Sequence, residues 1–213
     1  MAITTGRGVI AIVALRDPGE GKTRLSPALS REERAQLSRA MARDVVDALA
    51  AAGVPEVLVV AKGARAARFA HALELPVLRD RSLRAGLNAA LDDALQVVGP
   101  TRTALLVCAD LPGLQAADVS EVLAADADVV VAPTRDGGTG GLLLRPGARI
   151  DLAYGPGSAA AHRRRSVRAG LSLAEVVSAG FHHDVDEPTH LHDAVARWPG
   201  SHTGRTVTNW DVA

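Results

Sequence analysis

The chain alternates between short, continuous apolar runs and longer segments whose apolar residues recur at helical spacing. Continuous apolar runs are typical of strands buried on both faces of a sheet. Strands are therefore predicted at residues 9–15, 57–60, 103–108 and 128–132, with a short one around residue 77. Helices are predicted at residues 31–52, 64–73, 83–95 and 115–125, and another begins at Ser158. This alternation predicts an α/β fold with a largely parallel sheet and right-handed crossovers.

Capping residues mark the starts of two of these helices. Ser30 is followed three residues later by Glu33, which is the capping-box pattern, and the helix is expected to stop at Gly53. Ser82 is expected to cap the helix that carries leucines from Leu83 onward. The residues after Trp198 are interpreted as a polar tail of uncertain order.

Composition limits the classes of protein that fit. The length of 213 residues suits one domain, with a core at residues 8–195 and a polar tail at 199–213. Acidic and basic side chains balance at 24 each, so no global field attracts nucleic acid or an anionic membrane. No run approaches the ~20 apolar residues of a membrane span, and residues 1–8 lack the apolar core of a signal peptide. We therefore predict a cytoplasmic protein that binds neither nucleic acid nor membrane.

The single cysteine, Cys108, excludes an internal disulfide and any zinc site built from several cysteines. Because it lies inside an apolar run, we expect it to act as a small buried hydrophobic residue rather than a reactive thiol.

Three acidic residues are the strongest candidates for metal chemistry. Asp110 closes an apolar run, and Asp184 and Asp186 form a D-V-D triplet. On a strand, residues i and i+2 point to the same side, about 6–7 Å apart, and such carboxylates repel each other unless a cation lies between them. Mg²⁺ prefers oxygen ligands and commonly joins carboxylates to phosphates. His182 and His183 leave zinc or iron open as an alternative.

A glycine-rich loop near the N-terminus carries two cations. Gly21 precedes Lys22, and Arg24 follows two residues later. Backbone N–H groups in such a loop can wrap a triphosphate while the two side chains contact phosphate oxygens. A P-loop NTPase is the alternative, but it requires glycine where this chain has Arg16, and Pro27 interrupts the helix that should follow.

Two later glycine-rich segments are candidates for binding an anion. The turn at residues 136–141 surrounds Thr139 with glycines, either as a simple hairpin or because its backbone approaches a ligand closely. Ser158 is expected to start a helix, whose N-terminus attracts anions, and His162 lies one turn later on the same side. The arginines at 163–165 are equally well interpreted as a solvated helix face.

These short motifs occur in an order that resembles a known family. K-T-R-L, L-N-A-A-L at residues 87–91, A-D-L-P, the glycine–threonine turn, G-P-G-S-x-x-x-H and D-V-D-E-P resemble the phosphoenolpyruvate / 2-phospho-L-lactate guanylyltransferases of coenzyme F-420 biosynthesis. The resemblance covers roughly residues 8–195. It implies a single-domain, three-layer nucleotidyltransferase fold, Rossmann-like and of the glycosyltransferase-A type, related to the molybdenum-cofactor guanylyltransferases.

The resemblance also implies roles for individual residues. It implies two Mg²⁺ ions held by Asp110, Asp184 and Asp186, and an acid-binding site formed by residues 139–141 with Gly155 and Ser158. The expected site residues are, for the nucleotide, Gly21, Lys22, Arg24 and Asn88; for catalysis, Lys22, Arg24 and Asp110; and for the acid, Thr139, Gly141, Gly155, Ser158 and His162. The chain departs from the family pattern at Ala109 and at Gly140-Gly141, and the second departure bears on the acid-binding role of Thr139.

The expected reaction joins GMP from GTP to phosphoenolpyruvate. A phosphate oxygen of the acid attacks the α-phosphorus in line, and pyrophosphate leaves. A composition rich in alanine and arginine, typical of GC-rich actinobacteria, favours phosphoenolpyruvate over 2-phospho-L-lactate or 3-phosphoglycerate. A P-loop NTPase and a non-catalytic nucleotide sensor are the alternative classes. Self-association, or contact with a downstream pathway enzyme, is left open.

Overall fold

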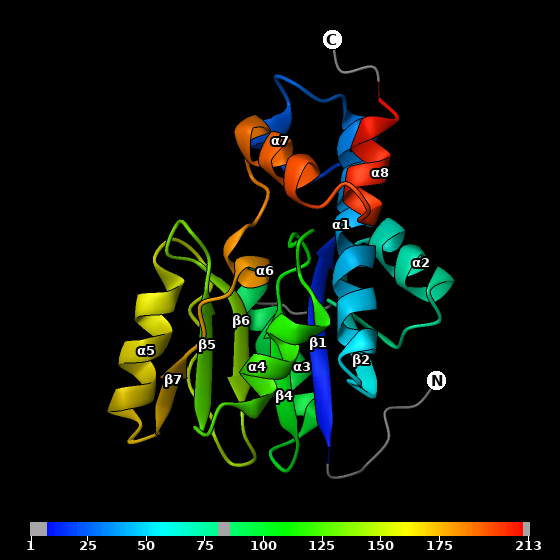
Figure 1. Ribbon diagram of the computed structural model, residues 1–213. Helices are drawn as coiled ribbons and strands as arrows, with labels where there is room; N and C mark the ends of the chain where they lie inside the picture. Colours follow the sequence, from blue (N-terminus) through cyan, green and yellow to red (C-terminus); the bar gives the residue numbers. More distant parts are fainter. Residues whose placement is uncertain (1–7, 81–85, 211–213) are drawn as a thin grey trace.

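A seven-stranded sheet forms the centre of the molecule, which is described by a computed structural model for residues 8–80 and 86–210 (Figure 1). The strand order is β3-β2-β1-β4-β6-β5-β7, and β6 runs antiparallel to both of its neighbours while the other pairs are parallel. The strands are β1 (Val9–Arg16), β2 (Glu56–Lys62), β3 (Val77–Arg79), β4 (Thr103–Val107), β5 (Val129–Pro133), β6 (Thr139–Leu144) and β7 (Leu173–Glu175). The predicted α/β fold with a mostly parallel sheet is confirmed.

Helices cover both faces of this sheet and make three layers (Figure 1). They are η1 (Thr23–Leu25), α1 (Arg31–Ala51), α2 (Ala64–Ala72), α3 (Leu87–Val98), α4 (Ala116–Ala124), α5 (Ser158–Arg168), α6 (Ala179–His182), α7 (Pro188–Arg197) and α8 (His202–Thr208). Side chains of α3 and α5 pack on one face, and those of α1, α2, α4 and α6 pack on the other. No helix among the described residues is both long enough and apolar enough to cross a membrane.

The predicted capping box at the start of α1 is confirmed. The Glu33 backbone N–H donates to Ser30 Oγ at 3.2 Å, and the Ser30 backbone N–H donates to Glu33 Oε2 at 2.7 Å. The other predicted cap, Ser82, and the first predicted helical leucine, Leu83, lie outside the described residues. The described helix begins at Leu87, after Gly86 with a φ of 117°.

The glycine-dense segment is partly strand rather than turn. Gly140 and Gly141 lie inside β6, between β4 and β5, and only residues 134–138 connect the two antiparallel strands. A Cβ on Gly141 would lie 2.6 Å from the Phe181 ring of α6. The close approach that excludes a side chain at Gly141 is therefore made by this helix.

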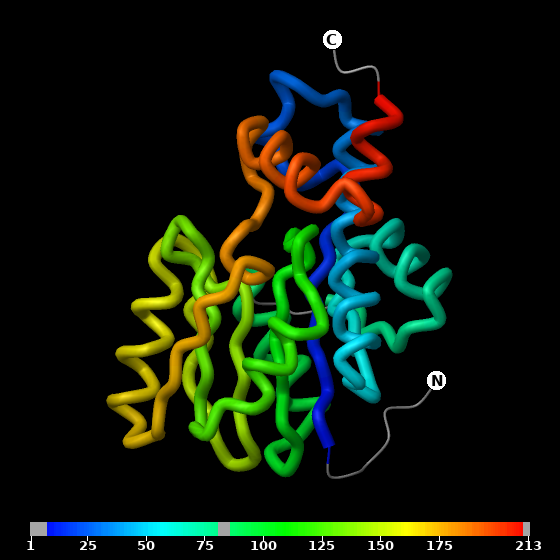
Figure 2. Tube along the Cα trace, viewed as in Figure 1, coloured from blue at the N-terminus to red at the C-terminus, as the bar shows by residue number. Residues whose placement is uncertain are grey.

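The predicted polar tail is wrong for residues 202–208, which form α8. Helices α7 and α8 lie beside the first part of α1, beyond the carboxyl end of β1, and the chain reaches them from α6 through one extended segment (Figure 2). Together with the segment after β1 they enclose a separate apolar cluster, here called the cap cluster: Leu25, Leu29, Leu37, Met41, Val185, Leu191, Ala194 and Val207. The prediction failed because α8 is short and mostly polar, so that few residues carry its helical period.

A buried carboxylate on α1 holds α8 in place. Asp44 is 8% exposed and accepts hydrogen bonds from the backbone N–H groups of His202 and Thr203, at 2.6 and 3.0 Å, and from Thr203 Oγ1 at 2.6 Å. Burial raises the pKa of Asp44, although these donors act in the opposite direction. The carboxylate thus satisfies free N–H groups at the start of α8.

Replacing Asp44 with alanine should lower the free energy of unfolding by about 3 kcal/mol, because three donors lose a charged acceptor in a buried position. Urea unfolding measures this change. The control is Asp47→Ala on the same helix, whose exposed carboxylate lies 2.8 Å from His202 Nε2; it should lose less than about 1 kcal/mol. Equal losses in the two variants would contradict the anchoring role of Asp44.

Candidate active site

A pocket of about 400 Å³ opens where the strand order reverses, beyond the carboxyl ends of β1, β2 and β4. Ligands of open α/β sheets bind at such switch points. Its lining includes Arg16, Gly21, Lys22, Lys62, Asp80, Leu87, Leu91, Asp110, Tyr154 and Asp186. Of the predicted site residues, the structure therefore brings together Gly21, Lys22, Asp110 and Asp186.

Lys22 occupies the centre of the polar end of this pocket. Its ammonium group donates to Asp110 Oδ2 and, at 2.7 Å, to Asp186 Oδ1, and its side chain is only 11% exposed. Burial acts to lower the pKa of Lys22, but the two carboxylates outweigh it and raise the pKa well above its ordinary value. Lys22 is also one of two non-glycine residues with positive φ among the described residues, at 55°, a conformation that side chains adopt only where the surroundings impose it.

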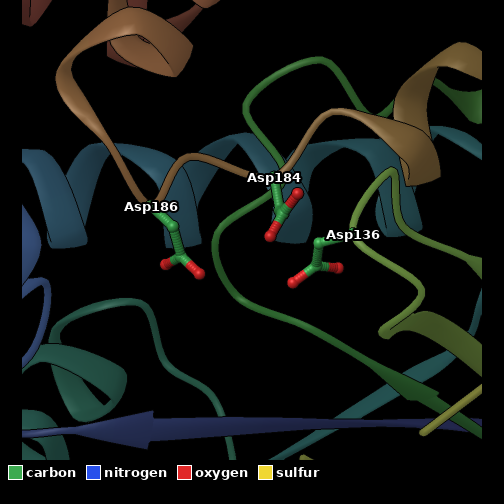
Figure 3. Close-up of side chains that lie close together, drawn as sticks. All are labelled: Asp136, Asp184 and Asp186. Carbon is green, nitrogen blue, oxygen red and sulfur yellow. The ribbon is translucent and has the colours of Figure 1, made fainter. Parts of the chain in front are cut away.

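Three carboxylates face a common space: Asp136, Asp184 and Asp186 (Figure 3). One oxygen from each lies within 4.8 Å of the others. Asp186 is also the one that accepts from Lys22. Asp136 was not predicted, although it begins the glycine-rich turn, and a carboxylate there was a signal that could have been used. Asp110, which was predicted as a metal ligand, lies outside this group and pairs with Lys22 instead.

Backbone contacts, rather than a strand, hold two of these three carboxylates. Asp184 and Asp186 were predicted on a strand, but residues 183–186 form an irregular extended segment between α6 and α7. Val185 lies between them, enters the cap cluster, and donates its N–H to the Asp110 carbonyl at 3.2 Å. Because Val185 points into the cap cluster, Asp184 and Asp186 point away from it. Their carboxylates lie close to each other, as the sequence predicted.

Arg135, which was also not predicted, ties the same segment to the sheet. Its backbone N–H donates to the His182 carbonyl at 3.0 Å, and its Nη2 donates to the Asp184 carbonyl at 2.8 Å. Its guanidinium also lies 3.8 Å from the Asp184 carboxylate and 3.8 Å from that of Asp193 on α7.

The donor set fits a hard divalent cation. Asp184 Oδ1 is buried and has no hydrogen-bond partner within the described ranges. Burial, followed by the charges of Asp110, Asp136 and Asp186, raises the pKa of Asp184 from 3.8 to about 6. A cation among the three carboxylates would relieve both effects, and an all-oxygen set suits Mg²⁺ or Mn²⁺ better than the zinc or iron that His182 and His183 suggested.

The predicted acid-binding hydroxyls form a buried chain with His162. Thr139 Oγ1 lies 3.0 Å from Ser158 Oγ and 3.0 Å from His162 Nδ1, while the Ala153 N–H donates to His162 Nε2 at 2.9 Å. Since Nε2 accepts, the neutral ring carries its proton on Nδ1 and donates to Thr139. Thr139 can then donate to Ser158, whose own proton is free to point elsewhere.

The remaining predicted residues have different surroundings. Asn88 exchanges two hydrogen bonds with the Tyr154 backbone, at 3.0 and 2.7 Å, so its amide holds the segment before α5. Arg24 is exposed, with its guanidinium 3.9 Å from Glu187. Gly155 lies at the exposed turn before α5 with a φ of 143°.

The N-terminal loop is not a P-loop. After Lys22 the chain makes the short 3-10 helix η1, and the next α-helix begins only at Arg31. A P-loop leads directly into a helix that presents its N-terminus to phosphate.

Comparison with known proteins gives one consistent result. A family model described as "Guanylyl transferase CofC like" matches residues 9–205. The 2-phospho-L-lactate guanylyltransferase of Methanothermobacter thermautotrophicus is 36% identical over 195 residues, covering 90% of this chain and 86% of that protein. The 3-phospho-D-glycerate guanylyltransferase of Phenylobacterium zucineum is 38% identical, covering 93% and 95%. The phosphoenolpyruvate guanylyltransferase of Roseiflexus castenholzii is 36% identical, covering 85% of each.

A solved structure supports the fold independently. The crystal structure of a putative nucleotide-diphospho-sugar transferase from Desulfovibrio desulfuricans superposes with a TM-score of 0.81 at 17% identity and covers 95% of both chains. At this identity the likeness concerns the fold alone.

The buried state of His162 has a measurable pH dependence. Burial, assisted by Arg165, lowers the pKa of His162 from 6.5 to about 4. The unfolded chain therefore takes up this proton below about pH 6.5, before the folded protein does, so stability present above that pH is lost as the pH falls toward 4. The loss attributable to this group should reach about 3 kcal/mol.

Urea unfolding of wild type and His162→Gln between pH 7 and 4 measures that contribution as the difference between the two pH profiles. His71→Gln, on the exposed surface of α2, is the matched control and should follow the wild type. An NMR titration in which His162 ionises near pH 6.5 would contradict the buried neutral ring.

Proposed function

This chain belongs to the family of CofC-like guanylyl transferases and is a nucleotidyltransferase, and we propose that it joins GMP from GTP to phosphoenolpyruvate. The products are enolpyruvyl-diphospho-guanosine and pyrophosphate, a step of coenzyme F-420 biosynthesis. The observation that carries this proposal is the meeting of Lys22 with the acidic residues at the mouth of a switch-point pocket. A cationic side chain that could bind phosphate therefore lies close to carboxylates that could bind a metal, so that one ligand could contact both.

The nucleotide is proposed to enter the pocket along α3 with its triphosphate toward Lys22. Gly21 and Lys22 line that end, and Arg24, exposed on η1, is free to approach the outer phosphates. Asn88 contributes indirectly, since both ends of its amide bind the Tyr154 backbone and so fix one wall of the pocket.

The phosphorylated acid is proposed to bind beside the metal carboxylates. Asp136 lies in the turn that leads into β6, and Thr139 is the first residue of β6. One short segment would therefore contact both the cation and the acid. Ser158, held by Thr139 and through it by His162, can present a hydroxyl from the start of α5. Gly155, at an exposed turn, would admit the ligand where a side chain would obstruct it, whereas the space beside Gly141 is filled by the Phe181 ring.

The chemistry requires little covalent participation from the protein. The attacking phosphate oxygen is already an anion, so no general base is needed, and the residues serve to align it with the α-phosphorus and to neutralise charge. Mg²⁺, held by Asp136, Asp184 and Asp186 with Asp110 nearby, would supply Lewis-acid stabilisation of the reacting oxygens. Lys22 and Arg24 would neutralise the departing pyrophosphate.

The acid is the least constrained part of the proposal. Relatives of similar identity carry the names of three different acids, each with a phosphate beside a carboxylate or one carbon further away. We expect pyrophosphate release to be fastest with GTP and phosphoenolpyruvate in a screen that crosses four nucleoside triphosphates with the three acids and Mg²⁺. Faster turnover with another acid would replace phosphoenolpyruvate. Release of phosphate without any acid would reject the transferase reaction for this chain.

Replacing Asp184 or Asp186 with asparagine should reduce pyrophosphate release about a hundred- to a thousandfold, since electrostatic groups at the reacting centre typically contribute this much. Circular dichroism and urea unfolding should show an intact fold in each variant. Asp126→Asn, an exposed carboxylate before β5 at the other end of the strands, is the control and should keep wild-type turnover. Near-normal turnover in either site variant would contradict the metal assignment.

A further inference from the structure

Asp186 belongs to two sets of contacts at once. On one side it shares the Lys22 ammonium with Asp110, and on the other it completes the group formed with Asp136 and Asp184. Four carboxylates thus surround two adjacent cation positions, and Lys22 already fills the one between Asp110 and Asp186. The other includes Asp184 Oδ1, which accepts no hydrogen bond from the described residues and lies 3.8 Å from Arg135 Nε, and it is the position open to a divalent ion.

We propose that Lys22 is an exchangeable cation of this site: it holds the position between Asp110 and Asp186 until a nucleotide arrives, and then moves to the triphosphate. The inference rests on the proposed function, because it requires a triphosphate ligand in the pocket. Lys22 would then have two alternative anionic partners, the Asp110–Asp186 pair and the triphosphate. A divalent ion would reach Asp110 fully only after the nucleotide has drawn Lys22 away.

The geometry of the loop supports an exchange. Lys22 lines the same pocket that the nucleotide would fill, so a short swing of its four-carbon side chain changes its partner without moving the backbone far. Its backbone is held at a φ of 55°, between Gly21 and η1, whose Leu25 is fully buried in the cap cluster. The anchored backbone therefore fixes the point from which the Lys22 side chain would reach either partner.

Electrostatics explains why the exchange is favourable. Without a ligand, one ammonium offsets the repulsion of two carboxylates, and its departure would leave them unpaired in a partly buried site. A triphosphate carries more negative charge than the pair, and it brings a coordinated divalent ion that can replace the ammonium. The two carboxylates then have a cationic partner, and Lys22 an anionic one, both before and after the nucleotide binds.

Lys22 can be observed selectively by NMR, because Lys22 and Lys62 are the only lysines in the sequence. Protein labelled with ¹³Cε-lysine should give two lysine signals, which Lys62→Arg assigns. Asp110→Asn should shift the Lys22 signal of the ligand-free protein, which identifies the ion pair. We expect Mg²⁺ alone to leave the Lys22 signal in place, and Mg²⁺ with the α,β-methylene analogue of GTP, which cannot release pyrophosphate, to shift it.

Calorimetry on the same samples separates the outcomes. If the analogue binds and the Lys22 signal does not move, the exchange is overturned while the proposed function stands. A shift of equal size with Mg²⁺ alone also overturns it, because the ion rather than the nucleotide would displace Lys22. If the analogue does not bind, the proposed function fails and this inference fails with it.

Metal affinity gives a second, independent readout. Without nucleotide, Lys22→Met should bind Mn²⁺ about tenfold more tightly than wild type, because removing a nearby positive charge changes the binding free energy of a divalent ion by this order at high effective dielectric. Lys22→Arg, which keeps the charge, is the control and should resemble wild type. Electron paramagnetic resonance of free Mn²⁺ measures both, and unchanged affinity in Lys22→Met would overturn the competition between ammonium and metal.

Discussion

Repulsion among carboxylates at one edge of the sheet is the constraint on which this site depends. Asp110, Asp136, Asp184 and Asp186 come from three separate parts of the chain and meet beside a partly buried pocket. Such a group is stable only with cations near it, and the protein supplies Lys22 beside Asp186 and Arg135 beside Asp184. The remaining negative charge would favour a divalent ion and, through the ion, the phosphate groups of the proposed substrates.

The sheet and the cap cluster each position part of these carboxylates. The sheet places Asp110 at the end of β4 and Asp136 at the end of β5, where buried apolar strands leave little freedom. Asp184 and Asp186 come instead from an irregular segment, and their positions depend on Val185, Arg135 and the cap cluster. Strand packing therefore fixes two of these four carboxylates, and contacts made late in the chain fix the other two.

The sequence predicted the fold well where local patterns determine it. Apolar runs located β1, β2, β4 and β5, and the Ser30 capping box located the start of α1. It did not predict β7, α7 or α8, whose apolar residues are few and are buried by partners distant in sequence, as Val207 is by the cap cluster. The antiparallel insertion of β6 between β4 and β5 was also missed, because pairing order is a property of the whole sheet.

In the site, the sequence identified residue types more reliably than contacts. It singled out Lys22 as a phosphate ligand and Asp110 as a metal ligand, but could not show that the two pair with each other. Arg135 was missed because it gains significance only when residues 182–186 fold against it. Asp136 was missed because it was treated only as part of the glycine-rich turn, although its carboxylate was a signal. Asn88 was expected at the nucleotide, whereas its partner is a backbone 66 residues away.

Val185 also links catalytic competence to the stability of a small peripheral structure. Its side chain is one of the members of the cap cluster, and the residues on either side of it are two of the three carboxylates. Loosening of α7 and α8 by heat would therefore disperse the acidic group while the seven-stranded sheet stayed folded. Such an enzyme would lose its activity at a temperature below the one at which its sheet melts, and a tightly bound ion would bring the two temperatures together.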